Sequence, residues 1–242
     1  MIVKFFEYRI SNVLPNWPIS NKIIINTINP HSFCVAVKEK RFKEALIKSD
    51  ILIPDGIGIV WALKVLNKIK ISRITGADMH NHLLNLAEIN TLKVFYLGAS
   101  ESTLLMIQEK LKIEHPSVKV GYFSPKFKNE FSVEESLEMI KNVNKYSPDI
   151  LFVGMTAPKQ EKWCYKFKNE LNANIIVSIG AVFDFYAGTV NRAPKIMIKL
   201  NLEWFYRLYK EPKRMWRRYL INNFKFVFYI LKEKYIKKNA FK

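Results

Sequence analysis

Short apolar runs alternate with longer segments of helical periodicity along most of this chain. Strand-like runs, apolar on both alternations, occupy residues 22–28, 50–54, 92–98, 118–123, 149–155 and 174–180. Helix-length segments occupy residues 31–48, 58–67, 77–88, 101–113, 133–145 and 158–171. This alternation is typical of βαβ units, and doubly apolar strands are typical of a sheet covered on both faces. We therefore expect an α/β fold with a Rossmann-like, mainly parallel sheet and helices on both faces.

The pattern changes near residue 194. From Lys195 onward the sequence carries no strand signal, and helix-prone segments broken by Pro212 interleave basic and aromatic residues. We predict a Rossmann-like body at residues 1–194 and a basic, aromatic helical appendage at residues 195–242. The apolar part of this appendage is too short and too polar to span a bilayer, so we expect an interfacial helix that associates with a membrane.

The net charge of +18 is unusually high, and it is unevenly distributed. Residues 192–242 contain 15 basic and 3 acidic residues, a net charge of +12. A field of that sign attracts phosphate, whether on nucleic acid, on membrane lipid or on a diphosphate ligand. Charge alone does not choose among these partners.

Polar residues follow four of the predicted strands. Thr27 and Asn29 end the first, Asp55 ends the second, and the stretches "TAPKQE" and "AVFDFYAG" follow the last two. Ligands of open parallel sheets bind outside the carboxyl ends of the strands, so these groups are expected to converge on one edge. Asp55 could still belong to an ordinary turn, because proline and glycine flank it. The topology favours a functional carboxylate.

Several chemistries lack their usual motifs. The chain has no H-E-x-x-H, G-x-S-x-G, Walker A or G-x-G-x-x-G sequence, and surface or capping roles are expected for His80 and His82. Cys34 and Cys164 lie far apart without a C-x-x-C, which argues against a disulfide scaffold and indicates a reduced compartment. No D-x-D occurs, so a departing diphosphate would need neutralisation by protein cations. We therefore predict no metal site and no cofactor. Neither a signal peptide nor a membrane-spanning run is expected.

Motifs along roughly residues 20 to 220 resemble, in order and spacing, the WecG/TagA/CpsF glycosyltransferases. They are "INTINPHSF", "IPDGIGIV", "RITGADM", "PDILFVGMTAPKQEKW", "VFDFYAGTVNRAPK" and "LEWFYRLYKEPKRMWRRY". The resemblance implies a cytoplasmic enzyme, peripherally associated with the inner face of the bacterial plasma membrane, that moves a hexose from a UDP-sugar to a polyprenyl-diphosphate-linked acceptor. The best-known members transfer N-acetylmannosamine to undecaprenyl-diphosphate-GlcNAc with inversion. Related members use other hexoses for capsule or exopolysaccharide synthesis. Whether the enzyme forms a homo-oligomer is left open.

The resemblance assigns the catalytic base to Asp55. A carboxylate suits this role, because an inverting displacement needs a base for the proton of the attacking hydroxyl. Gly56 and Gly58 would let backbone and substrate approach closely. The alternative is that Asp55 caps the helix expected at residues 58–67, and both roles could hold together.

Further site residues follow from the same resemblance. Thr27 and Asn29 would contact acceptor or donor sugar, although Asn29 also fits a helix-entry turn. Arg73 would bind phosphate, with a solvated loop cation as the alternative. Gln160 would lie in the donor site, and Asp184 would contact the nucleotide unless it is buried with a partner.

The resemblance also assigns three arginines of the appendage to closure of the site over the diphosphate. Arg207, Arg214 and Arg217 would share one face of a continuous helix, although Pro212 could bend it. The alternative is a charge stripe that faces anionic lipid. For the adjacent Arg218 we expect a lipid-facing or solvated position.

Two rival functions come from other classes. A basic module that binds nucleic acid would use the aromatic appendage and would not need Asp55. An NAD(P)-linked oxidoreductase could use the same sheet, but the dinucleotide fingerprint is missing. The glycosyltransferase prediction, which involves no nucleic acid, accounts for more of the motifs.

Overall fold

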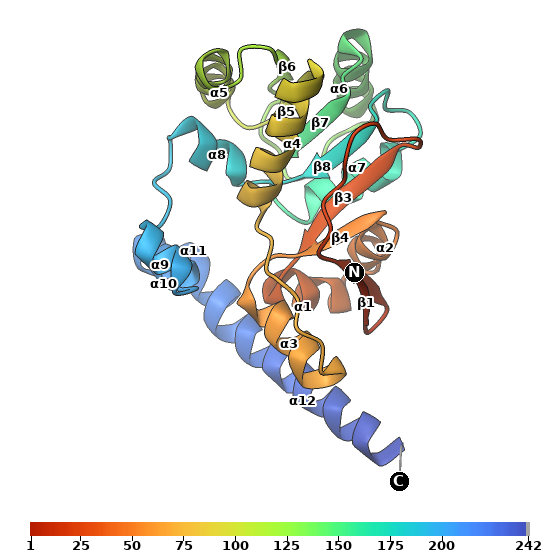
Figure 1. The fold of residues 1–242 in the computed structure, drawn as a ribbon, viewed down its shortest axis with the longest axis vertical. Helices are drawn as coiled ribbons and strands as arrows, with labels where there is room; N and C mark the ends of the chain where they lie inside the picture. Colours follow the sequence, from red (N-terminus) through yellow and green to blue (C-terminus); the bar gives the residue numbers. More distant parts are fainter. Residues whose placement is uncertain (241–242) are drawn as a thin grey trace.

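A computed structural model describes residues 1–240 and contains one eight-stranded sheet (Figure 1). The strands are β1 (Ile2–Phe5), β2 (Tyr8–Ser11), β3 (Ile23–Ile28), β4 (Ile51–Pro54), β5 (Lys93–Gly98), β6 (Lys119–Phe123), β7 (Ile150–Gly154) and β8 (Ile175–Ser178). Their order is β1-β2-β4-β3-β8-β7-β5-β6. The β1–β2 pair is antiparallel and every other pair is parallel, which confirms the expected α/β fold with a mainly parallel sheet.

Helices fill the connections as the periodicity predicts. Those of the body are α1 (Pro30–Lys38), α2 (Lys40–Ile47), α3 (Ile57–Asn67), α4 (Gly76–Asn90), α5 (Glu101–Glu114), α6 (Val133–Tyr146), α7 (Lys159–Phe167) and α8 (Val182–Ala187). The C-terminal part contains α9 (Lys195–Lys199), α10 (Glu203–Lys210), α11 (Pro212–Trp216), a π-helical turn η1 (Arg217–Ile221) and α12 (Asn222–Ala240).

Two local features differ from the sequence-based expectation. The β1–β2 hairpin was not predicted, because its strands have four residues each and its turn at Phe6 has a positive φ of 51° without glycine. The helix expected at residues 31–48 is two helices, since Glu39 adopts an extended conformation between α1 and α2.

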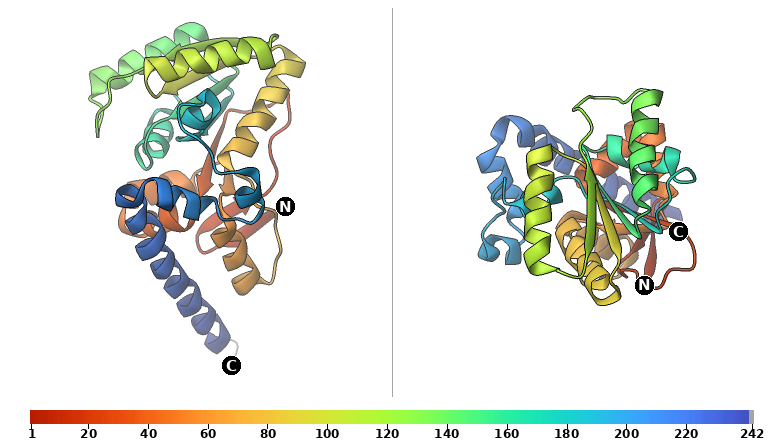
Figure 2. Two further views of the ribbon diagram at one scale, coloured as in Figure 1. Left: turned by 90° about the vertical axis from the view of Figure 1, so that its left-hand side faces the viewer. Right: turned by 90° about the horizontal axis from the view of Figure 1, so that it is seen from above.

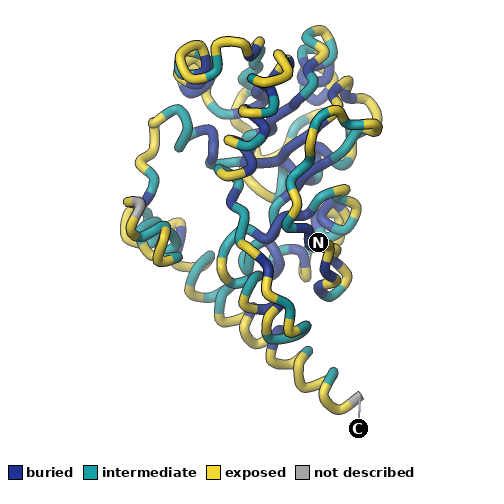
Figure 3. The backbone as a smooth tube through the Cα atoms, viewed as in Figure 1, coloured by how far each residue is buried: buried dark blue, intermediate teal, exposed yellow. Residues whose placement is uncertain are grey.

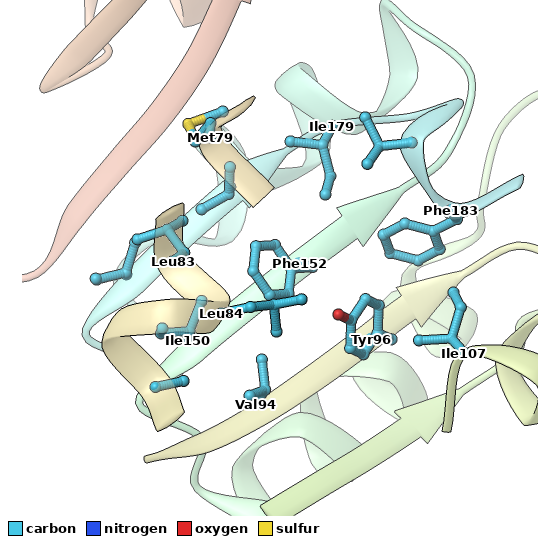
Figure 4. Packing of buried hydrophobic residues seen from close by; sticks show 14 of the residues in the cluster. Met79, Leu83, Leu84, Val94, Tyr96, Ile107, Ile150, Phe152, Ile179 and Phe183 are labelled. Atoms are coloured by element: carbon cyan, nitrogen blue, oxygen red, sulfur yellow. The ribbon is translucent and has the colours of Figure 1, made fainter. Parts of the chain in front are cut away.

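Side chains alternate between the two faces of the central sheet. Val94 and Tyr96 of β5 face a cluster formed with α4, α5 and α8, part of which is shown in Figure 4. Phe95 and Leu97 of the same strand face a second cluster with α6 and α7. Viewed from above, Figure 2 shows helices on both sides of the strands. Burial on both faces explains the continuous apolar runs.

A third cluster joins the C-terminal helix to the body. Phe226 and Ile230 of α12 are buried with residues of the hairpin, α1 and α3, whereas the end of α12 is mostly exposed (Figure 3). Gly58 permits this packing, because a Cβ there would overlap the Pro30 ring and approach Phe226. The predicted boundary at residue 194 falls between α8 and α9, and α12 shares a core with the body across it.

Candidate active site

Four neighbouring strands carry the predicted site residues at their carboxyl ends. β4, β3, β8 and β7 are consecutive in the sheet and mutually parallel. Asp55 follows β4, Asn29 follows β3, Asp184 lies in α8 after β8, and Gln160 lies in α7 after β7. The topology therefore brings these four residues to one edge, as the order of the motifs predicts.

Asp55 is held at the end of β4 by its own backbone. Its amide donates to the Ile28 carbonyl oxygen at 2.9 Å, which extends the β3–β4 pairing by one step. The N-cap of α3 is Gly56, which has a positive φ of 95°, and no side chain caps this helix. The capping alternative for Asp55 is therefore wrong, and its half-buried carboxylate is available for chemistry.

Charged and polar groups from separate elements surround the Asp55 carboxylate. Burial is the largest effect and raises the pKa of Asp55. The charges of Arg218 and Arg73 and the Asn29 side chain oppose this rise in pKa, whereas the charge of Glu203 adds to it. Arg218 lies in η1 and Asn29 lies directly before α1. Arg73 lies in the loop before α4, and Glu203 is the first residue of α10. A desolvated carboxylate with an elevated pKa is better suited to accept a proton than an exposed aspartate.

Asn29 caps the helix that follows it, as the helix-entry alternative predicts, and its contact with a sugar stays a prediction. Its Oδ1 accepts from the Ser32 amide at 3.0 Å and its own amide donates to Ser32 Oγ at 2.8 Å, a capping box for α1. Its side chain also favours the ionised form of Asp55, which opposes the rise in the pKa of that carboxyl group. Thr27 lies two residues earlier on β3, opposite Ile53 of β4, and is partly exposed.

Gln160 and Glu161 form a buried polar chain at the start of α7. Gln160 Oε1 accepts from the Met155 amide at 3.0 Å, and its Nε2 donates to Glu161 Oε1 at 2.9 Å. Gln160 thus ties the β7–α7 turn together, and a donor contact stays a prediction. Burial raises the pKa of Glu161 to about 7, opposed by Gln160, Arg218 and Lys162.

A cavity of about 430 Å³ lies beside this edge, between α8 and the helices α10 and α11. Asp184, Arg207 and Arg214 line it together. The Arg207 guanidinium lies 5.5 Å from the centre of the Phe185 ring, and Arg214 Nε donates to Glu211 at 2.8 Å. Burial raises the pKa of Asp184, while a hydrogen bond from Thr189 and the charge of Arg214 lower it. Three of the predicted site residues, Asp184, Arg207 and Arg214, therefore line the same cavity.

The arginine doublet of η1 is oriented differently from our expectation. Arg217 is exposed, with its guanidinium 5.2 Å from the Trp216 ring centre. Arg218 is partly buried and interacts electrostatically with Asp55. The expectation of a solvated or lipid-facing Arg218 is wrong, because the π-helical turn changes the rotation per residue and breaks the predicted continuous stripe. A functional role for Arg217 stays a prediction.

The remaining titratable candidates are structural. Among residues 1–240, no group of three or more His, Cys, Asp or Glu side chains is arranged to hold a metal ion. His80, expected at the surface, is buried with a ring nitrogen 2.7 Å from Tyr96 Oη, and burial lowers its pKa to about 3. Cys34 and Cys164 are buried and unpaired. Within the same range, no helix has the length and apolar character needed to cross a bilayer.

Sequence reasoning missed three charged residues at this edge: Glu161, Glu203 and Arg218. Glu161 follows Gln160 in the stretch "TAPKQE". An acidic residue in the first turn of a helix is equally well explained by its favourable interaction with the helix dipole. Glu203 lies in the motif "LEWFYRLYKEPKRMWRRY", in which only arginines were expected to have a role, and its side chain pairs with Arg192 Nε at 3.4 Å. Long-range packing brings Glu203 and Arg218 toward Asp55 and buries Glu161 at the start of α7.

Comparisons with known proteins show which family this chain belongs to. A family model described as "Glycosyl transferase WecG/TagA/CpsF family" matches residues 8–240. An N-acetylglucosaminyldiphosphoundecaprenol N-acetyl-beta-D-mannosaminyltransferase of Bacillus subtilis is 32% identical over 90% of this chain and 82% of its own. Proteins of the same description from Bacillus spizizenii and Staphylococcus aureus are 33% and 30% identical, over 81% and 82% of this chain and 74% and 76% of theirs. The chain belongs to the WecG/TagA/CpsF family of glycosyltransferases.

Proposed function

We propose that this enzyme transfers N-acetylmannosamine from UDP-N-acetylmannosamine to GlcNAc-diphosphoundecaprenol, with inversion. The names of the relatives give the acceptor and the transferred sugar. The observation that carries the proposal is the position of the half-buried Asp55 carboxylate at the ligand-binding edge of the sheet, where Asn29, Arg73 and Arg218 favour its ionised form.

In the proposed reaction Asp55 is the general base. It takes the proton of the acceptor hydroxyl while that oxygen bonds to the anomeric carbon of the donor. The bond between the anomeric carbon and the diphosphate oxygen breaks on the opposite side, and UDP leaves with the electron pair. Burial favours this step, since it raises the pKa of Asp55 toward that of a useful base.

Protein cations supply the neutralisation that the leaving group needs. Arg207 and Arg214 line the 430 Å³ cavity together with Asp184, so a diphosphate in this cavity would meet two guanidinium groups. Guanidinium groups bind phosphate through paired, charge-assisted hydrogen bonds. We propose that catalysis proceeds without a metal ion.

The C-terminal helices provide a surface suited to the proposed lipid-linked acceptor. Phe224, Phe228 and Tyr235 of α12 are 76%, 65% and 68% exposed, on the side away from the buried Phe226. Basic residues of the net +12 segment accompany them. Aromatic insertion at headgroup level together with attraction to anionic lipid favours peripheral membrane association over nucleic-acid binding.

Turnover with a panel of UDP- and GDP-hexoses and a water-soluble prenyl-diphosphate-GlcNAc analogue tests the proposal. We expect UDP-N-acetylmannosamine to be the preferred donor and the product to have the inverted configuration. Preference for another hexose would assign the enzyme to capsule or exopolysaccharide synthesis instead. Absence of turnover with every donor, together with tight oligonucleotide binding that weakens steeply with salt, would overturn the proposal.

A further inference from the structure

α8 is too short to hold its own orientation. It has six residues, its N-cap Ala181 makes no side-chain capping bond, and it ends at Gly188, which has a positive φ of 82°. Helices of this length are not stable by themselves, so neighbouring elements set the direction in which α8 points its side chains. That direction matters for the candidate site, because Asp184 and Phe185 of α8 line the 430 Å³ cavity.

The next residue of α8, Tyr186, is held by two residues of α5. Lys110 Nζ donates to the Tyr186 carbonyl oxygen at 3.1 Å and lies 4.6 Å from the centre of the Tyr186 ring. Tyr186 Oη donates to Glu114 Oε2 at 2.9 Å, and Lys110 Nζ lies 3.8 Å from Glu114 Oε1. Lys110 and Glu114, one turn apart on α5, therefore contact both the backbone and the side chain of Tyr186. We call these three residues the α5–α8 anchor.

Lys110 takes the place of a backbone donor at the end of α8. In a continued helix the Val190 amide would donate to the Tyr186 carbonyl oxygen, but it donates to the Asp184 carbonyl oxygen at 3.3 Å instead. The Lys110 ammonium group supplies the donor, and its positive charge lies where the helix dipole is negative. Lys110 thus stabilises the end of α8 in one position.

The inner side of the Tyr186 ring is also in contact. The centre of the His80 ring lies 4.8 Å from that of Tyr186, at an interplanar angle of 71°, and His80 Nε2 lies 2.7 Å from Tyr96 Oη. His80 and Tyr96 are buried, whereas the side chains of Lys110 and Glu114 are 41% and 47% exposed. Tyr186 is therefore fixed between buried rings and a partly exposed ion pair. Burial and the bond to Glu114 raise the pKa of Tyr186, so its hydroxyl remains a donor at neutral pH.

Fixing Tyr186 also fixes the two cavity residues that precede it. α8 lies between α5 on one side and the helices α10 and α11 on the other (Figure 1). Successive residues of an α-helix point about 100° apart, so a Tyr186 directed at α5 leaves Asp184 and Phe185 directed at the cavity. The Arg207 guanidinium lies 5.5 Å from the centre of the Phe185 ring. A rotation of α8 about its axis would displace this ring and the Asp184 carboxylate together.

We propose that Lys110 and Glu114 are positioning residues of the donor site, which act through Tyr186 by fixing the rotation of α8. Both lie outside the set of residues that line the cavity, so neither is expected to touch the nucleotide sugar. The inference rests on the proposed function, because it takes the nucleotide sugar as the ligand of the cavity that Asp184 and Phe185 line. It extends the functional region to α5, one helix beyond the cavity wall.

The kinetics of K110M, measured on the full chain with the water-soluble acceptor analogue, test this role. Loss of the cation at the end of α8 should raise the UDP Kd and the donor KM about fivefold and leave the acceptor KM and Tm nearly unchanged. K110R keeps the charge and should restore most of the affinity. The matched control is K112M, because Lys112 is exposed on the same helix and pairs with Glu109 at 2.6 Å instead.

Two further variants test the bond between Tyr186 and Glu114. Y186F removes the hydroxyl but retains the ring against His80, so it should raise the donor KM in the same direction as K110M. E114A removes the same hydrogen bond from the other partner and should match Y186F. Amide hydrogen exchange should be faster in α8 of all three variants than in α8 of the wild type, and unchanged in α4, because only α8 loses a support.

The outcomes separate this inference from the proposed function. A wild type that binds no UDP and transfers no sugar overturns the proposed function. A wild type that binds UDP, with K110M and Y186F equal to K112M in donor KM, overturns the inference and leaves the proposed function intact. A rise in both KM values together with a lower Tm in K110M would make the contacts purely structural. Failure of K110R to restore donor affinity would exclude the cation as the anchoring group, and an unchanged donor KM in E114A would remove Glu114 from the role.

Discussion

The backbone amide of Asp55 donates to the Ile28 carbonyl oxygen at 2.9 Å. Asn29, the residue after Ile28, caps α1 through the Ser32 amide, and its side chain favours the ionised form of Asp55. The end of β3 therefore holds the proposed base in register with the start of α1.

Asp55→Asn should lower turnover about 10²-fold or more, with donor affinity little changed, because the amide keeps the shape but accepts no proton. In the wild type, activity requires the unprotonated carboxylate and falls as pH drops. Burial raises the pKa of Asp55, so the acidic limb of the kcat profile should lie above the usual aspartate range. Near-normal turnover of Asp55→Asn would exclude it as the base.

Turnover should survive an excess of EDTA, because arginines rather than a divalent ion are proposed to neutralise the departing diphosphate. The measurement is the initial rate before and after chelation, with Mg²⁺ or Mn²⁺ added back. Loss of activity that either ion restores would show that the site requires a metal.

Removal of charge at Arg214 should reduce activity far more than it reduces sedimentation with anionic liposomes. Arg214 lines the 430 Å³ cavity with Asp184, whereas many other cations of the C-terminal segment remain for lipid. Lys213→Ala, an exposed neighbour, serves as the control for both assays. Equal losses in the two assays for Arg214→Ala would favour the lipid-contact alternative.

Glu161→Gln should become increasingly stable relative to the wild type as pH rises from 5 to 8. Burial raises the pKa of Glu161 to about 7, so the folded state retains a proton that the unfolded state has released. Wild-type stability therefore falls across this window, by up to about 3 kcal/mol, and is constant above it. Thermal melts at several pH values check the prediction, and a constant difference in Tm would contradict it.

Two sets of phenylalanine variants separate the faces of α12. Phe224→Ala/Phe228→Ala should weaken binding to anionic liposomes with little change in Tm, because both side chains are largely exposed. Phe226→Ala should instead cost about 3 kcal/mol of stability or more, because Phe226 is 2% exposed in the core shared with α1 and α3. Unchanged liposome binding in the double variant would remove α12 from the membrane surface.

The sequence by itself determined the central sheet and the ligand-binding edge. Strand and helix periods are local signals, so the six runs that form β3 to β8 could be found without knowledge of their partners. Parallel pairing then places Asp55 and Asn29 at one edge, because every such strand has its carboxyl end on the same side. The family motifs supplied the expected chemistry of these positions.

Only the tertiary structure decided which charged groups accompany Asp55. Arg217 and Arg218 are neighbours in a basic, helix-prone stretch whose local sequence does not show which of them is exposed. In the structure they lie in a π-helical turn next to Asn222, which contacts His31, and Arg217 is exposed whereas Arg218 is partly buried. The burial of Glu161 likewise depends on packing that no local pattern records. The two short strands of the hairpin are stabilised by a core that α12 completes more than 200 residues later. Local sequence specifies backbone conformation, whereas desolvation and charge pairing depend on which distant elements meet, and these set the pKa values of the site.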